Sequence, residues 1–216
     1  MNKKELRTLQ SACSKLDQFN DYRMHDYICI LMNTVLDFQM QTPVVQRAYE
    51  HYINNRRSEI RSHSDLQRLL SKYPNTLKSN TRLAQYLWGT NHWSRVKLLR
   101  ELVKFFEAEN VRGYKSLKKW IDKSTFENIQ GKVVVRDKDT GKVIHSIGPV
   151  LFEWLRLRLG KDTIKADVHV KRFMEKVLGY TPSSDIIISS LIEVSRNIGV
   201  KPRELDAAIW HEMSGY

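Results

Sequence analysis

One acidic residue, Asp167, stands where a carboxylate could act on an anionic ligand. It directly precedes VHVKRFMEKVL, whose apolar residues follow the spacing of an amphipathic helix. An Asp at this place can serve simply as the N-cap of that helix. The first turn, however, carries His169, Lys171 and Arg172, and cations there oppose the helix dipole unless an anion such as phosphate lies nearby. The pattern therefore indicates carboxylate chemistry beside a phosphate, with helix capping as the simpler interpretation.

A Gly-Pro turn lies shortly before this residue. Gly148 permits a close approach of the backbone, and Pro149 is suited to a first helical turn. Amides at such a helix start can face a phosphate. Gly160 then ends the short amphipathic helix. Taken alone, this pattern fits any helical hairpin.

Composition narrows the classes of partner and cofactor. The chain has 216 residues, 41% of them hydrophobic, and a net charge of +12, which favours a polyanion such as nucleic acid. Its two cysteines are too few for a four-cysteine zinc site or an iron–sulfur cluster. We find no HExxH, P-loop or GxGxxG pattern, no secretion signal and no membrane-spanning apolar run. We expect a cytoplasmic protein.

Helical periodicity covers most of the chain and predicts an all-α fold with one small β-hairpin insertion. The hairpin is predicted at about 132–145, around Asp139-Thr140-Gly141. It is either an insertion without a binding role or a DNA-facing flap. The second interpretation rests on four cations of the hairpin: Lys132, Arg136, Lys138 and Lys142. Helices are predicted at 3–19, 24–37, 43–57, 64–72, 80–88, 94–108, 115–122, 149–159, 168–178, 183–197 and 202–214.

The segment from Ser146 to Phe173 resembles the helix-hairpin-helix and Gly/Pro…Asp signature of a DNA glycosylase superfamily. This superfamily includes endonuclease III, adenine glycosylase and 3-methyladenine glycosylase. The family's Gly-x-Gly hairpin corresponds to Ser146-Ile147-Gly148, with Ser in place of the first Gly. Its Val-Asp-Thr-His-Val segment corresponds to residues 166–170, which read ADVHV.

Two further regions agree with this resemblance in the expected order. Residues 35–52 are similar to the family's Leu-Ser-Gln-Gln-Thr segment, which offers a Gln to the DNA, so the intercalating residue is Gln39 or Gln41, with Gln39 preferred. The stretch NHWSRVKLLRELVKFF resembles its Tyr-x-x-Lys-Ala helix. The resemblance implies a single glycosylase-like domain of two helical lobes flanking a DNA-binding cleft. One lobe spans about 25–130, and the other spans about 131–216 together with an N-terminal helix at 1–20.

The resemblance also implies a mechanism, in which a damaged, modified or mispaired base is flipped out of the duplex and its bond to deoxyribose is hydrolysed. Asp167 would be the catalytic carboxylate. No cofactor is implied except a monovalent cation at the hairpin when DNA is bound. We expect a monomer associated with the nucleoid and active in base-excision repair. The implied DNA contacts are Gly148, Pro149, Val150, Gln39, Gln41, His169, Lys171 and Arg172, and the candidate base pocket is Trp88, His92 and Trp93, whose tryptophans are otherwise core residues.

One departure from the family pattern concerns strand cleavage. Members that nick the strand carry a Lys one or two residues after the second hairpin Gly, where this chain has Val150 and its neighbours. We therefore predict a glycosylase without lyase activity, with a displaced lysine such as Lys142 as the alternative. A non-catalytic DNA-binding or damage-sensing module is the other alternative. The sequence leaves the identity of the excised base open.

Overall fold

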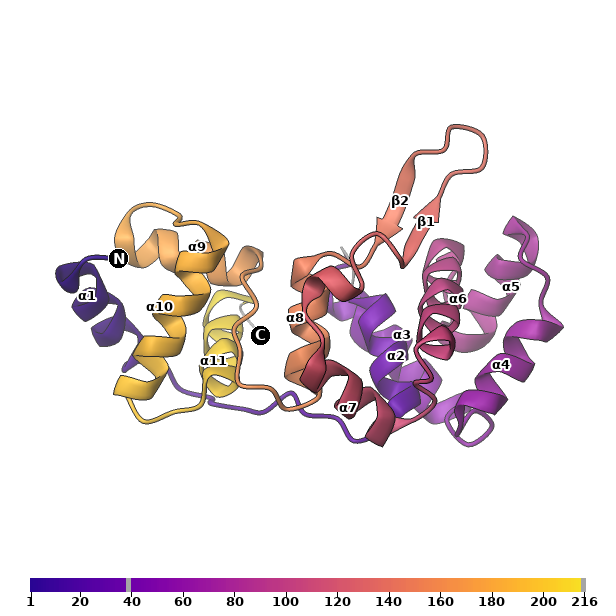
Figure 1. Ribbon diagram of the computed structural model, residues 1–216, viewed down its shortest axis with the longest axis horizontal. Coiled ribbons are helices and arrows are strands. Elements are labelled where there is room, and N and C mark those ends of the chain that lie inside the picture. The colour runs from indigo at the N-terminus through magenta and orange to yellow at the C-terminus, as the bar shows by residue number, and fades with distance from the viewer. Residues whose placement is uncertain (38–39, 215–216) are drawn as a thin grey trace. The chain divides into compact units, whose positions relative to one another are not determined.

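The computed structural model describes residues 1–37 and 40–214, which are mostly helical and carry one small antiparallel sheet (Figure 1). This confirms the predicted all-α class with a single β-hairpin. The chain divides into two compact units. The split unit is built from residues 1–23 and 153–216, and the continuous unit from residues 24–152.

The continuous unit is organised around α2 (Tyr27–Leu36), in which every residue is buried. A helix that is apolar on all sides is stable only when other elements surround it, and α3, α4 and α6 contact it. Asp26 begins α2, since its carboxylate accepts a hydrogen bond from the amide of Cys29. The other helical elements of this unit are α3 (Thr42–Asn55), α4 (His63–Lys72), α5 (Leu77–Trp88), α6 (Trp93–Ala108), α7 (Tyr114–Lys123) and the 3-10 turn η1 (Phe126–Asn128).

The hairpin consists of β1 (Val134–Arg136) and β2 (Val143–Ser146), paired antiparallel with Val135 opposite His145. Both strands pack on α6, and Nε2 of His145 lies 2.8 Å from Oγ of Ser94. The sequence-based division grouped these residues with the lobe that carries Asp167. The hairpin instead belongs to the continuous unit, because the buried side chain of Val135 faces the core of that unit.

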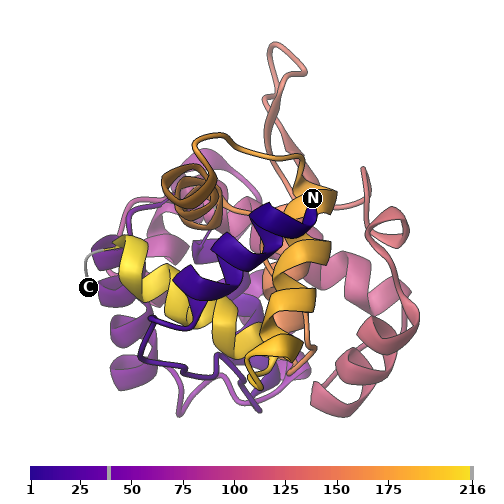
Figure 2. The same cartoon turned by 90° about the vertical axis from the view of Figure 1, so that its left-hand side faces the viewer.

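The split unit has a core formed by the N-terminal helix and three consecutive helices near the C-terminus. The N-terminal helix α1 (Lys3–Cys13) contacts α9 and α10 (Figure 2). Buried apolar side chains such as Leu9, Val170 and Leu191 fill the space between them. The other helices of this core are α9 (Val168–Leu178), α10 (Ser184–Asn197) and α11 (Pro202–Ser214), and α8 (Pro149–Arg158) begins in the continuous unit and ends in this one.

The first helix is shorter than predicted, since it ends at Cys13 rather than at residue 19. Beyond it, Gln18 adopts a left-handed backbone conformation with a φ of 56°, which a right-handed helix cannot contain. Asp, Asn and Ser in this stretch also favour turns over helix interiors. The segment that follows is therefore free to run across the split unit without helical structure.

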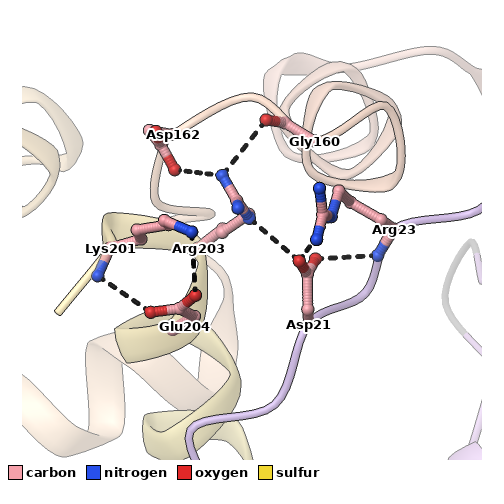
Figure 3. Close-up of polar contacts among 7 residues, drawn as sticks. All are labelled: Asp21, Arg23, Gly160, Asp162, Lys201, Arg203 and Glu204. Carbon is pink, nitrogen blue, oxygen red and sulfur yellow. Dashed lines mark hydrogen bonds and ion pairs between the residues drawn. The ribbon is translucent and has the colours of Figure 1, made fainter.

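A buried arginine holds three segments of the split unit together (Figure 3). Arg203 of α11 is only 5% exposed. Its Nε donates to the carboxylate of Asp21 at 3.2 Å, and its Nη1 donates to Asp162 and to the carbonyl of Gly160 at 3.3 Å. Asp21 also pairs with Arg23. The network fixes the N-terminal segment and the connector between α8 and α9 onto α11.

We predict that Arg203→Met lowers the free energy of unfolding by about 2–3 kcal/mol, because its charge-assisted hydrogen bonds to Asp21 and Asp162 are lost. The matched control is Lys201→Met, which removes the exposed ion pair to Glu204 and should cost less than about 0.5 kcal/mol. Urea unfolding of both variants measures the difference. Equal stability of the two variants would contradict the role assigned to Arg203.

Candidate functional site

Asp167 occupies the N-cap position of α9, as its sequence context predicts. Its Oδ1 accepts hydrogen bonds from the amides of His169 at 2.9 Å and Val170 at 3.0 Å. The residue itself has an extended backbone, which lets the side chain turn back onto the first helical turn. The two hydrogen bonds fix the carboxylate in place. Its side chain is 14% exposed, so it still reaches the surface.

The second oxygen of Asp167 binds a lysine that the sequence analysis did not single out. Nζ of Lys165 lies 3.0 Å from Oδ2 of Asp167, and the lysine side chain is only 10% exposed. The same ammonium lies 4.0 Å from the centroid of the Trp154 ring, a favourable cation–π arrangement. Tyr22 packs edge-on against that ring, with centroids 4.8 Å apart. A buried ammonium needs such partners, because an unpaired one is costly to desolvate.

A second carboxyl group, Asp206 of α11, lies beneath this pair. It is fully buried, and its Oδ1 accepts a hydrogen bond of 2.7 Å from the backbone amide of Lys165. Its Oδ2 has no hydrogen-bond partner among the described residues. Burial raises the pKa of Asp206 to about 7, against the lowering effect of the charge on Lys165. Asp206 can therefore gain or lose a proton near neutral pH.

Glu153 of α8 completes a group of four side chains, which we call the Asp167 cluster: Glu153, Lys165, Asp167 and Asp206. The carboxylate of Glu153 accepts hydrogen bonds from Arg156 at 2.8 Å and from the hydroxyl of Thr163 at 2.6 Å. The negative charges of Asp167 and Glu153 both raise the pKa of Asp206. Clusters of this kind, with a perturbed carboxyl group beside others, are typical of functional sites.

The three cationic candidates after Asp167 share the first turn of α9 with it. His169 is half-buried, and its ring centroid lies 6.1 Å from that of Trp210. Its Nδ1 is buried and has no partner among the described residues. Lys171 is half-buried and Arg172 is exposed. The structure thus brings these three residues to the same helix start as the candidate carboxylate.

The Gly-Pro turn lies in the continuous unit, at the beginning of α8. Pro149 and Val150 are exposed, and no atom beyond its chain neighbours lies within 4 Å of a Cβ built on Gly148. The first turn of α8 has no acidic residue. The start of this helix is therefore open to a ligand, and Val150, where a lyase would carry its lysine, offers no amine.

The remaining candidates from the sequence lie elsewhere in the continuous unit. Gln39 falls outside the described residues, whereas Gln41 is exposed and is the N-cap residue of α3 without a side-chain capping bond. Trp88 is fully buried at the end of α5, which corrects its assignment to a base pocket, because a core ring is not free to stack on a base. His92 is exposed, and Trp93 is half-buried with Nζ of Lys97 lying 4.8 Å from its ring centroid.

Lys165 and Asp206 are the functional candidates that sequence reasoning missed. Lys165 stands two positions before Asp167, in the same connector. Asp206 stands within LDAAI, where an acidic residue interrupts an apolar stretch of a predicted helix. A charged residue in an apolar helix face is a usable signal of a buried site; Asp206 carries it, whereas Lys165, in the connector, does not.

The described residues contain neither a candidate metal site nor a candidate membrane span. In residues 1–37 and 40–214, no group of three or more His, Cys, Asp or Glu side chains is placed to hold a metal ion. Within the same ranges, no helix has both the length and the apolar character needed to cross a membrane.

The comparison with known proteins identifies the family. The chain belongs to the family described as a domain of unknown function (DUF8548), whose model matches residues 38–214. That span includes every member of the Asp167 cluster. No curated protein and no solved structure matches the chain.

The raised pKa of Asp206 predicts a pH-dependent stability. In the unfolded chain this carboxyl titrates near 3.8, and in the fold it titrates near 7. Between these values the folded state keeps a proton that the unfolded state releases, so the free energy of unfolding falls as pH rises, by up to about 1.4 kcal/mol per pH unit. Asp206→Asn should remove this component, because an amide does not titrate.

Urea unfolding at pH 5 and pH 8 measures the effect. The matched control is Asp17→Asn, which changes an exposed aspartate of the same unit and should retain the wild-type pH dependence. An Asp206→Asn variant that loses as much stability between pH 5 and pH 8 as the Asp17→Asn variant would rule out titration of Asp206 in this range.

Proposed function

We propose that this protein is a DNA repair glycosylase that flips a damaged, modified or mispaired base from duplex DNA and hydrolyses its N-glycosidic bond. The observation that carries the proposal is Asp167. Its carboxylate is fixed at the start of α9 by two amides and a buried ammonium. It stands in the sequence context that resembles the glycosylase signature.

The chemistry of base removal suits a carboxylate held in this way. As the N-glycosidic bond breaks, positive charge develops on the deoxyribose, and a preorganised negative group nearby lowers the barrier. An ionised carboxylate offers about four lone-pair sites, of which the amides of His169 and Val170 and the ammonium of Lys165 use three. The remaining site can face the sugar or accept a proton from the attacking water.

The charge distribution supports DNA as the substrate. The net charge of +12 favours a polyanion, and Lys171 and Arg172 place cations beside the candidate carboxylate. The open start of α8 offers the backbone N–H groups of Gly148 and Val150 to a phosphate, whereas Pro149 has no N–H to donate. With Val150 at the lyase position, we propose base removal by water and an abasic site as the product.

A second candidate function, strand cleavage at abasic sites, is favoured by one specific observation. The amine of Lys165 lies 3.0 Å from Asp167, so an amine and a carboxylate stand together without a lysine in the hairpin. After losing its proton, such an amine could attack the C1′ aldehyde of the ring-opened abasic sugar and form a Schiff base with release of water, after which β-elimination expels the 3′ phosphate and breaks the strand. Lys165 therefore replaces Lys142 as the displaced lysine of interest, since Lys142 lies in the loop of the β-hairpin.

A non-catalytic DNA-binding module is the remaining alternative. It explains the net charge and the basic first turn of α9 equally well. It gives no reason for a buried lysine paired with the capping carboxylate, because an N-cap needs only an oxygen that accepts from the helix amides. Salt-sensitive binding to abasic DNA without release of any base is the result that would favour it.

We predict that Asp167→Asn lowers the rate of base release by about 100-fold or more, because the transition state loses its anionic partner. Asparagine is as good an N-cap as aspartate, so the helix start is preserved. The assay is mass spectrometry of bases released from duplexes carrying alkylated, oxidised and mismatched bases. The matched control is Asp17→Asn, which should retain wild-type activity. Wild-type protein that releases no base from this panel would refute the proposal.

Borohydride trapping on abasic DNA separates the two catalytic candidates. The proposed hydrolytic enzyme forms no covalent adduct, and its product strand breaks only after treatment with alkali. A trapped adduct that disappears in Lys165→Gln and persists in Lys142→Gln would instead establish lyase chemistry at Lys165. Lys142→Gln also removes one amine, so the comparison of the two variants tests whether the position of the amine decides adduct formation.

A further inference from the structure

The β-hairpin extends from the continuous unit well beyond the helices that anchor it (Figure 1). Its base is held by buried apolar side chains on both strands and their extensions, including Val133, Val135 and Ile147. His145 adds a polar contact to Ser94 of α6. Residues 138–143 are exposed. A two-stranded hairpin gains little stability by itself, so the projecting part contributes little to the core.

The loop at the tip has a defined conformation. The carboxylate of Asp137 accepts hydrogen bonds from the amides of Asp139 at 3.1 Å and Thr140 at 2.8 Å, and from the hydroxyl of Thr140 at 2.9 Å. These bonds lower the pKa of Asp137. Gly141 takes the positive φ of 67° that closes the loop. The loop at the tip therefore has a fixed conformation, and the carboxylate of Asp137 is occupied by hydrogen bonds within that loop.

Cations outnumber acidic residues on this hairpin. Residues 132–142 contain four Lys or Arg and two Asp, and one of these two, Asp137, is bound within the loop. Arg136 donates to the carbonyl of Gly141 at 3.2 Å and stays at the surface. Lys138 and Lys142 are exposed, so their side chains reach solvent. Their ammonium groups are thus available to an external anion.

We infer that the hairpin is a second DNA contact, which binds the phosphate backbone of the duplex through Lys138, Lys142 and Arg136. Duplex DNA as the partner rests on the proposed function. A two-stranded ribbon has the width that the major groove admits, and cations on its loop then meet phosphates at the groove edges. The contact is independent of base sequence, because ammonium groups that bind phosphates carry no base readout. It adds affinity at a place separate from the Asp167 cluster.

The test compares two double variants with the same loss of charge. The first is Lys138→Gln with Lys142→Gln. The matched control is Lys115→Gln with Lys119→Gln, two exposed lysines of α7, which lies at the far end of the continuous unit from the hairpin tip in Figure 1. Binding of each protein to an undamaged duplex of about 20 base pairs is measured from low to moderate salt. Thermal unfolding of both variants verifies that the fold is intact.

We expect the hairpin variant to bind about 10-fold more weakly near 0.1 M salt and its salt dependence to flatten. Each phosphate contact contributes a slope of about −0.9 to the plot of log affinity against log salt, so loss of two contacts reduces the slope by about 2. The control variant should keep the wild-type slope. Equal losses in both variants, or no loss in either, would overturn the inference.

Base release by the same proteins keeps the two proposals distinguishable. If the hairpin variant binds like wild type while wild type still releases a base, the hairpin inference fails and the proposed function stands. If the hairpin variant loses binding while wild type releases no base, the hairpin contact stands and the glycosylase proposal fails. Preferential binding of wild-type protein to RNA or to an acidic protein over duplex DNA would also overturn the inference.

Discussion

The buried guanidinium of Arg203 is the constraint on which the split unit depends. This unit is assembled from two distant pieces of the chain, and a cation removed from water must have its hydrogen bonds satisfied. Asp21 meets that requirement from the N-terminal segment, and Asp162 and the carbonyl of Gly160 meet it from the connector between α8 and α9. The N-terminal segment is thereby fixed to α11, and so is the start of the connector that leads to Lys165 and Asp167.

Charge balance within the Asp167 cluster follows from that placement. The ammonium of Lys165 is paired with Asp167 and lies over Trp154, so Asp206 receives only the backbone amide of Lys165 as a donor. With a proton on Asp206, the lysine and the two aspartates have no net charge, which lowers the cost of burying them. Burial raises the pKa of Asp206, and the charge of Lys165 opposes that rise only in part.

The sequence predicts the amphipathic helices well because they carry an apolar stripe at helical spacing, as α9 does before Leu178. The N-cap role of Asp167 and the position of the hairpin follow from equally local patterns. The burial of Lys165 does not, since it depends on Trp154 and on Asp206, which stands 41 positions away. The burial of Trp88 in the core likewise depends on packing between helices, which no local pattern specifies.

The ion pair itself separates a structural role for Asp167 from a chemical one. Capping α9 requires a single acceptor oxygen, which Ser, Thr or Asn also supplies. Burying Lys165 against the second oxygen adds a desolvation cost that a salt bridge only partly offsets. A chain that needed only stability would gain more from an apolar residue at position 165 combined with a neutral cap at position 167. The arrangement is better explained if a rigidly oriented carboxyl group at position 167 is itself what the site requires.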